Sequence, residues 1–188
     1  MFASRTTSFF ALAASLAGVL AQSTTPYTDA ATGITFQQFA STSGLSFGIA
    51  LPEEAGKDFI GQISASTTGW AAITMTGSMR NSLLAVAWPN GESIMSSLRT
   101  TTGYSNPSVY DGDATIRTIT EGTSVNSTGF TFTFLCEGCI VDGMTFDVTA
   151  DTGVLGWAMS SDSPTNPSSA SSALEYHDAG KDPSPKVH

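Results

Sequence analysis

Short apolar and β-branched stretches recur along the chain, separated by Gly, Pro, Asn and Asp, and no long segment has the 3.6-residue period of an amphipathic helix. Phe130, Phe132 and Phe134 alternate with threonines, as in a strand with one buried face. Turn residues stand at 89–91, 111–112 and 151–153. About ten strands at this spacing predict an all-β fold, an antiparallel two-sheet β-sandwich. The predicted strands are 34–39, 45–51, 59–66, 70–76, 83–88, 93–98, 114–120, 130–136, 145–149 and 154–160.

Residues 1–21 have the pattern of a secretory signal peptide. Arg5 supplies the positive charge, residues 9–20 form an apolar core, and small residues precede a cleavage site after Ala21. A membrane anchor is the less favoured alternative, because the apolar run is shorter than the roughly 20 residues that span a bilayer. Cleavage leaves a single domain, residues 22–188, which is 167 of the 188 residues. We expect this domain to be secreted and extracellular, with no membrane span.

The predicted mature chain is strongly acidic. Without Arg5 it keeps 6 basic residues against 16 acidic ones, a formal net charge of −10. Binding to phosphate groups needs clustered Lys and Arg side chains, so this composition argues against nucleic acid and anionic membranes as partners.

Cys136 and Cys139 form a C-x-x-C pair. Such a pair can be redox active, but that function requires a βαβ setting in which the motif begins a helix. Here the pair follows a predicted strand in a secreted chain, which favours a structural disulfide across a turn over a thiol oxidoreductase. Asn126-Ser-Thr128 is a glycosylation sequon between two predicted strands, so we expect a glycan on Asn126 in a surface turn.

The composition changes near the C-terminus. Residues 161–173 are rich in Ser and Pro, which predicts a linker or a long surface loop. Residues 174–177 follow, and then a polar tail over residues 178–188. Whether residues 174–177 fold back onto the sandwich decides what His177 can do.

Most catalytic classes lack the residues that they need. No Gly-rich loop begins a helix, and no Gly-x-Ser-x-Gly motif is present, so nucleotide binding and serine hydrolysis have no basis. The two histidines, His177 and His188, are too few for a multi-histidine zinc or copper site. No pair of carboxylates stands out for glycoside hydrolysis.

Met79 and His177 remain as candidate ligands. Met79 lies in a loop between two predicted strands. A thioether and an imidazole are one axial pair for low-spin haem, and with both axial positions filled the iron can only transfer electrons. Spacing alone indicates this weakly, because a lone Met usually packs in a core and a lone His near a terminus is usually solvated.

A series of short motifs adds a family resemblance. In order and spacing they are similar to the cytochrome domain of fungal cellobiose dehydrogenases, over residues 22–177. The motifs are Gln22-Ser23, Tyr27-Thr-Asp29, Thr32-Gly33, Gly69-Trp70, Gly77-Ser-Met-Arg-Asn-Ser-Leu-Leu84, Val86-Ala-Trp88, Asn90-Gly91, Thr102-Gly-Tyr104, Asn126-Ser-Thr128, Cys136-Glu-Gly-Cys139, Gly153-Val-Leu-Gly-Trp-Ala158 and Glu175-Tyr-His177.

The resemblance implies an immunoglobulin-like or DOMON-like β-sandwich with haem b held by loops at one end. It implies that Met79 and His177 are the axial ligands of the haem iron and that Tyr104 contacts a haem propionate. It also implies a disulfide between Cys136 and Cys139, in agreement with the reasoning from their setting.

By the same resemblance, the domain accepts single electrons from a flavin-dependent sugar dehydrogenase and passes them to an extracellular acceptor such as a copper-dependent polysaccharide oxygenase, with no substrate chemistry of its own. The flavin domain of those enzymes has no counterpart in the 11 residues after His177, so we expect a stand-alone form. The alternative is a haem-free β-sandwich module that binds carbohydrate or another small ligand. A flexible 161–173 segment that leaves His177 in solvent would favour it, and exposed tryptophans would support it further. Trp70, Trp88 and Trp157 could line the haem pocket, but core packing is the favoured expectation for them.

Overall fold

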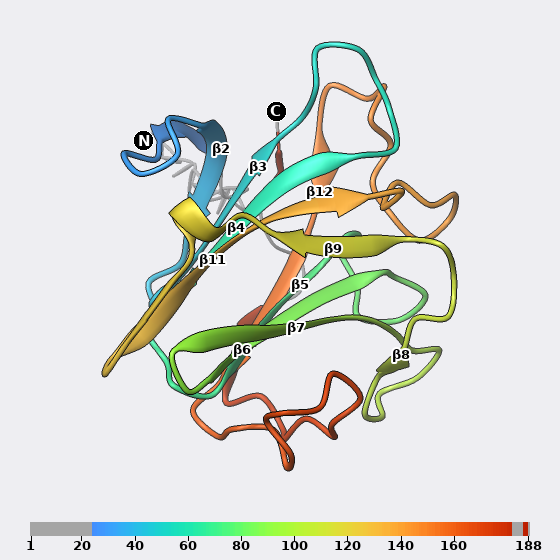
Figure 1. Cartoon of the computed structure of the whole chain (residues 1–188). Coiled ribbons are helices and arrows are strands. Elements are labelled where there is room, and N and C mark those ends of the chain that lie inside the picture. Colours follow the sequence, from blue (N-terminus) through green and yellow to red (C-terminus); the bar gives the residue numbers. More distant parts are fainter. Residues whose placement is uncertain (1–23, 182–185, 188) are drawn as a thin grey trace, which may run out of the picture.

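The computed structural model describes residues 24–181 and 186–187, and within them the chain is built almost entirely from β-strands (Figure 1). Its one helical element in this part is a single 3-10 turn, η1 (Thr120–Gly122). Among the described residues, no helix is long and apolar enough to cross a membrane. The predicted signal peptide lies outside the described residues. The prediction of an all-β fold with two antiparallel sheets is confirmed.

The first sheet has seven strands, all antiparallel to their neighbours. Strands β9 and β10 pair with different halves of β11, while β4 pairs along its other edge. In sheet order the strands are β1 (Thr25–Thr28), β2 (Thr35–Ala40), β3 (Leu45–Ala50), β4 (Phe59–Ala65), β11 (Gly129–Glu137) and β10 (Ser124–Asn126), with β9 (Thr115–Thr118) also paired to β11.

The second sheet has six strands and is also antiparallel. Its central hairpin joins β6 and β7 at Gly91, whose positive φ of 66° confirms the predicted Asn-Gly turn. In sheet order the strands are β14 (Ala179–Lys181), β13 (Gly156–Ser160), β5 (Trp70–Thr74), β6 (Leu84–Asn90), β7 (Ser93–Thr100) and β8 (Ser108–Val109). A separate pair joins β12 (Gly153–Val154) to β15 (Lys186–Val187).

The main hydrophobic core lies between the two sheets. Alternate residues of the facing strands point inward, as the pleat requires. Strand β11 contributes Phe130, Phe132 and Phe134, and β5 contributes Ala71 and Ile73, all of them buried. The predicted inward face of residues 130–136 is therefore confirmed.

Close packing in this core depends on Gly61 of β4. It is the register partner of Phe134 on β11. A methyl group added at Gly61 would overlap the Phe134 ring. That ring has little room to move, since it stacks on Phe132 with centroids 5.0 Å apart and packs edge-on against Phe59.

Nine of the predicted strand positions coincide with strands of the structure, within a few residues at each end. The predicted strand at residues 145–149 is wrong, because local side-chain hydrogen bonds hold this segment in turns. The Thr145 hydroxyl bonds to both backbone groups of Val141, and the Asp147 carboxylate accepts from the Thr149 N–H and hydroxyl. Phe146 still packs against the core, on Phe59.

The turn between β1 and β2 is closed by Asp29. Its carboxylate accepts hydrogen bonds from the Thr32 N–H at 2.8 Å and the Thr32 hydroxyl at 2.7 Å. Burial on its own raises the pKa of Asp29, but these hydrogen bonds outweigh it and hold the pKa below its usual value. The ionised carboxylate therefore stabilises this turn.

Candidate functional site

The outer face of the six-stranded sheet is apolar and buried, although it points away from the sandwich core. Trp70 and Ala72 of β5 and Leu84, Val86 and Trp88 of β6 form this second cluster, while the residues between them point into the main core. In most antiparallel sandwiches the outer faces are solvated. A second apolar face must be shielded from solvent by another part of the chain. Residues 161–177, which we call the covering segment, do this here.

The covering segment is attached to the sheet through its backbone carbonyls. The Trp88 indole N–H donates to the Pro167 carbonyl at 2.8 Å, and the Trp70 indole N–H donates to the Glu175 carbonyl at 3.1 Å. Leu174 is buried against the same apolar face. In Figure 1 the segment runs in orange and red along the lower side of the second sheet. The predicted Ser/Pro-rich loop is thus packed against the sheet.

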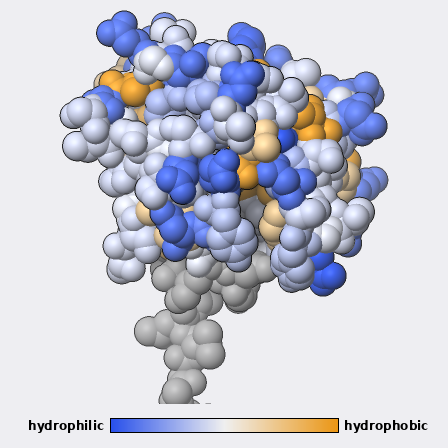
Figure 2. Space-filling model, turned by 90° about the horizontal axis from the view of Figure 1, so that it is seen from below, coloured by the Kyte–Doolittle hydropathy of each residue, from blue (hydrophilic) through white to orange (hydrophobic). Residues whose placement is uncertain are grey.

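A cavity of about 380 Å³ lies between the sheet and the covering segment, within the roughly 300–1,000 Å³ usual for small-molecule sites. Its walls come from β5, β6 and β13, from Met79, from residues 104–107 and from residues 174–177. Figure 2 views the molecule from this side, and hydrophobic residues are visible in a hollow framed by hydrophilic ones. The sheet side of the cavity includes the small residues Ala72 and Ala158.

Met79 reaches the cavity from the loop between β5 and β6. Asn81 allows this loop to turn back, because its φ of 55° is left-handed and its N–H donates to the Thr101 carbonyl at 2.8 Å. The Thr76 hydroxyl donates to the Ser78 carbonyl at 3.1 Å and fixes the start of the loop. Met79 is half-buried and packs against the outer-face cluster.

His177 reaches the same cavity from the end of the covering segment. Its two chain neighbours are both fixed to β13: the Ser160 hydroxyl donates to the Tyr176 carbonyl at 3.0 Å, and the Asp178 N–H donates to the Met159 carbonyl at 3.2 Å. The His177 ring is half-buried and stacks on the exposed Tyr176 ring, with centroids 4.6 Å apart. The two residues singled out in the sequence as candidate ligands, 98 positions apart, therefore line one cavity.

Tyr104 lies at the rim of the cavity and is 78% exposed. The Arg80 guanidinium lies over its ring, 5.1 Å from the centroid, as in a cation–π contact. A hydroxyl and a cation therefore stand together where the cavity opens to solvent.

The three tryptophans are all buried, as expected. Trp70 is also part of the cavity wall, and Trp88 is completely buried beneath the covering segment. Trp157 belongs to the main core, where its ring lies 6.5 Å from that of Phe39, and it also lines the cavity. Sequence reasoning missed the apolar outer face, although the run of five apolar residues from Leu84 to Trp88 lacks the polar alternation of a strand with one solvated face.

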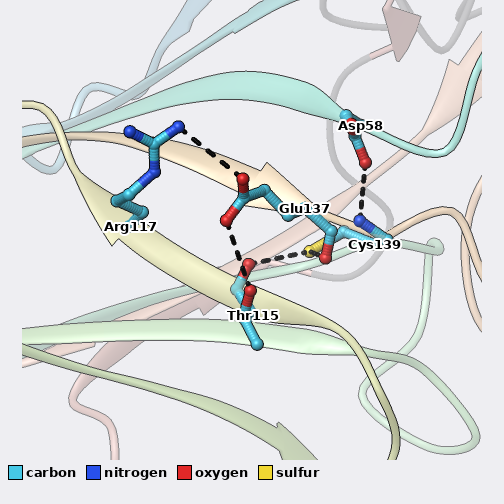
Figure 3. A network of polar contacts seen from close by, with 6 residues as sticks. Asp58, Thr115, Arg117, Glu137 and Cys139 are labelled. Atoms are coloured by element: carbon cyan, nitrogen blue, oxygen red, sulfur yellow. Dashed lines mark hydrogen bonds and ion pairs between the residues drawn. The ribbon is translucent and has the colours of Figure 1, made fainter.

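The disulfide between Cys136 and Cys139 is confirmed, and it lies outside the cavity wall. Its turn is fixed by Asp58, whose carboxylate accepts from the Gly138 N–H at 2.7 Å (Figure 3). Figure 3 also shows Glu137 between Arg117, 3.6 Å away, and the Thr115 hydroxyl. Both sulfurs belong to fully buried residues, which suits a structural bridge.

Asn126 is the exposed last residue of β10, directly before the turn to β11, and its side-chain oxygen accepts hydrogen bonds from Thr128. No group of three or more His, Cys, Asp or Glu side chains in the described part of the chain could hold a metal ion. Met79 and His177, the two candidate ligands of the sequence analysis, both line the cavity.

Comparison with known proteins gives a consistent result. The family model of the "cytochrome domain of cellobiose dehydrogenase" matches residues 27–184. The pyrroloquinoline quinone-dependent pyranose dehydrogenase of Coprinopsis cinerea is 32% identical over 164 residues, which cover 82% of this chain and 22% of that protein. The chain thus spans about a fifth of the length of this relative.

Two solved structures have the same fold. The cytochrome domain of Myriococcum thermophilum cellobiose dehydrogenase matches with a TM-score of 0.75 and 34% identity, over 86% of this chain and 88% of that one. The cytochrome b domain of pyranose dehydrogenase from Coprinopsis cinerea matches with a TM-score of 0.76 and 30% identity, over 84% of this chain and 85% of that one.

Proposed function

The chain belongs to the family of cytochrome domains of cellobiose dehydrogenase, and from this premise we propose that it is a secreted b-type cytochrome domain that transfers single electrons. The observation that carries the proposal is that Met79 and His177 line one cavity, from two segments far apart in the sequence. Together they supply one thioether and one imidazole, a standard axial pair for low-spin haem iron.

The cavity residues fit haem b. Ala72, Val86 and Ala158 offer an apolar wall to the macrocycle, and Trp70 and Leu174 extend it. Haem b, when bound, supplies an iron that exchanges one electron between its ferric and ferrous states. The apolar wall would hold the ring and exclude water from it, and Met79 and His177 would ligate the iron, which would leave no open site for dioxygen or substrate.

The rim residues fit the polar edge of the same cofactor. We assign a propionate contact to the Tyr104 hydroxyl, and the Arg80 cation over its ring adds positive charge at this edge. Haem b held with its polar edge at this rim would exchange electrons at the cavity mouth.

The relatives are cytochrome domains of sugar dehydrogenases, which supports a dehydrogenase as the electron donor. We propose a flavin-dependent sugar dehydrogenase as this donor and a copper-dependent polysaccharide oxygenase or another one-electron acceptor outside the cell. A glycan on the exposed Asn126 is consistent with secretion, and this residue does not line the cavity.

The carbohydrate-binding alternative has little support. An exposed tryptophan platform and a flexible segment before His177 would favour it. All three tryptophans are buried, and the covering segment is hydrogen-bonded to the sheet.

The test is a visible absorption spectrum of the secreted protein loaded with haem, oxidised and then reduced with dithionite. We expect the sharp reduced α and β bands of a low-spin b-type haem. Met79→Ala and His177→Ala should leave the sandwich folded and convert the haem to a five-coordinate form or release it. Met95→Ala is the matched control for the thioether, because Met95 packs against the outer-face cluster without lining the cavity.

A protein that stays colourless with haem would refute the cytochrome function. Unchanged low-spin spectra in both ligand variants would refute the assignment of Met79 and His177.

A further inference from the structure

Arg99 is a buried cation beside the cavity. It lies on β7 directly opposite Leu84, a residue of the cavity wall, so both side chains are on the outer face of the sheet. Arg99 is only 2% exposed, and burial lowers the pKa of its guanidinium below the usual value. A buried charge is costly unless its hydrogen bonds are satisfied.

The guanidinium is satisfied by neutral oxygens. Nε donates to the Ser97 hydroxyl at 2.7 Å, and Nη1 donates to the Pro107 carbonyl at 2.9 Å. Nη2 donates to the carbonyls of Ala170 and Ser172, at 2.7 and 2.8 Å. The rigid planar fork of arginine makes this pattern possible, because it directs several N–H groups at once toward separate acceptors.

These bonds join two walls of the cavity. Pro107 belongs to the wall formed by residues 104–107, and Ser172 lies five residues before His177 in the covering segment. Asn106 continues the connection, since its side-chain N–H donates to the Leu174 carbonyl at 2.6 Å. Arg99 of the sheet and Asn106 of the loop between β7 and β8 therefore hold the covering segment at residues 170, 172 and 174, shortly before the candidate ligand.

We propose that Arg99 and Asn106 are positioning residues for His177: they clamp the covering segment on the sheet and so place the imidazole at the iron. This inference rests on the proposed function. Neither residue ligates iron. Arg99 acts through backbone carbonyls, so the side chains of residues 170–172 can vary while the clamp persists.

The test compares Arg99→Lys, Asn106→Ala and the control Arg117→Lys in the haem-loaded protein. Lysine keeps the charge but cannot reach the carbonyls of both walls at once. Arg117→Lys is the same substitution at an exposed position. Arg117 forms a surface ion pair with Glu137, 3.6 Å away, and such exposed pairs contribute little to stability. The readouts are the low-spin fraction, the rate of haem transfer to excess apomyoglobin, and the spectrum after imidazole is added.

We expect haem transfer about tenfold or more faster in Arg99→Lys, because a hydrogen bond to a charged group is worth at least that factor in an equilibrium constant. The low-spin fraction should fall in both clamp variants, and free imidazole should restore it by occupying the position that His177 leaves. A general loss of stability would not respond to imidazole. Arg117→Lys should behave as the wild type.

Wild-type spectra and transfer rates in both clamp variants would overturn the inference while leaving the proposed function intact. If Arg99→Lys does not fold, Asn106→Ala alone decides. A wild-type protein that binds no haem would overturn the proposed function, and with it the role in ligand placement. Limited proteolysis within residues 161–177 would then still report whether Arg99 and Asn106 hold the segment.

Discussion

Replacing Ala72 by phenylalanine should fill the cavity and give effects of opposite sign in the absence and presence of haem. Ala72 lies in the middle of the cavity wall, paired with Ala158 on one side and Val86 on the other. Its side chain points to the outer face, so a larger residue there enters the cavity and leaves the sandwich core unchanged.

The magnitude follows from the area that the new ring buries. Full burial of a phenylalanine side chain is worth about 1.5–3 kcal/mol relative to exposure. The cavity opens to solvent at Tyr104, so we expect the low end of this range, about 1.5 kcal/mol, as stabilisation of the haem-free protein. A free haem concentration of a thousand times the dissociation constant stabilises the wild-type domain by about 4 kcal/mol. The variant, whose cavity is filled, loses this stabilisation.

Urea denaturation with and without haem measures both effects. Without haem, Ala72→Phe should be the more stable protein; with haem, the wild type should be. Ala40→Phe, at an exposed position of β2, controls for the substitution itself. Ala71→Phe faces the sandwich core and should destabilise the fold under both conditions by overpacking. A low-spin haem spectrum in Ala72→Phe would refute the placement of the haem in this cavity.

Three further outcomes are expected. Gly61→Ala should lower the free energy of unfolding by about 1–3 kcal/mol, since the new methyl group overlaps the Phe134 ring in a packed core, and urea denaturation measures this. Replacing Cys136 and Cys139 together by alanine should cost about 2 kcal/mol from the lost loop constraint and leave the haem spectrum unchanged, because the bridge lies outside the cavity wall. The Asp29 carboxylate has a folded-state pKa below the reference value of 3.8. Its contribution to the stability of the fold is therefore fully present above pH 3.8 and is lost as the pH falls through the lower folded-state pKa. The stability difference between wild type and Asp29→Asn should therefore shrink on acidification, as measured by denaturation at a series of pH values.

Most of the fold follows from alternating hydrophobicity and turn residues. The alternating pattern correctly predicts β4 and β11, whose apolar residues face one core. It fails for short edge strands such as β1, all of whose residues are exposed, because backbone pairing without burial leaves no apolar pattern. It fails at residues 145–149 for the opposite reason: the β-branched residues are present, but side-chain hydrogen bonds supply the backbone with partners outside a sheet.

The candidate site is harder to predict from the sequence than the fold. The resemblance identified Met79 and His177 as a pair, but nothing local to either residue indicates a shared cavity. Arg99 would be assigned to the surface by its charge, and its burial depends on carbonyls 71 and 73 positions away. Such acceptors are backbone groups that every residue possesses, so no side-chain pattern marks them.

The composition of the covering segment has a physical explanation of the same kind. A Ser/Pro-rich stretch resembles a linker because it lacks the apolar side chains of a packed element. Here the sheet supplies the donors instead: the indoles of Trp70 and Trp88 and the guanidinium of Arg99 all bind backbone carbonyls of the segment. The apolar wall can therefore be closed by a polar segment, and the specificity of this closure lies in the sheet. Substitutions at exposed serines of the segment, such as Ser168→Ala, should leave haem retention unchanged, whereas loss of a donor in the sheet should release the segment and, with it, His177.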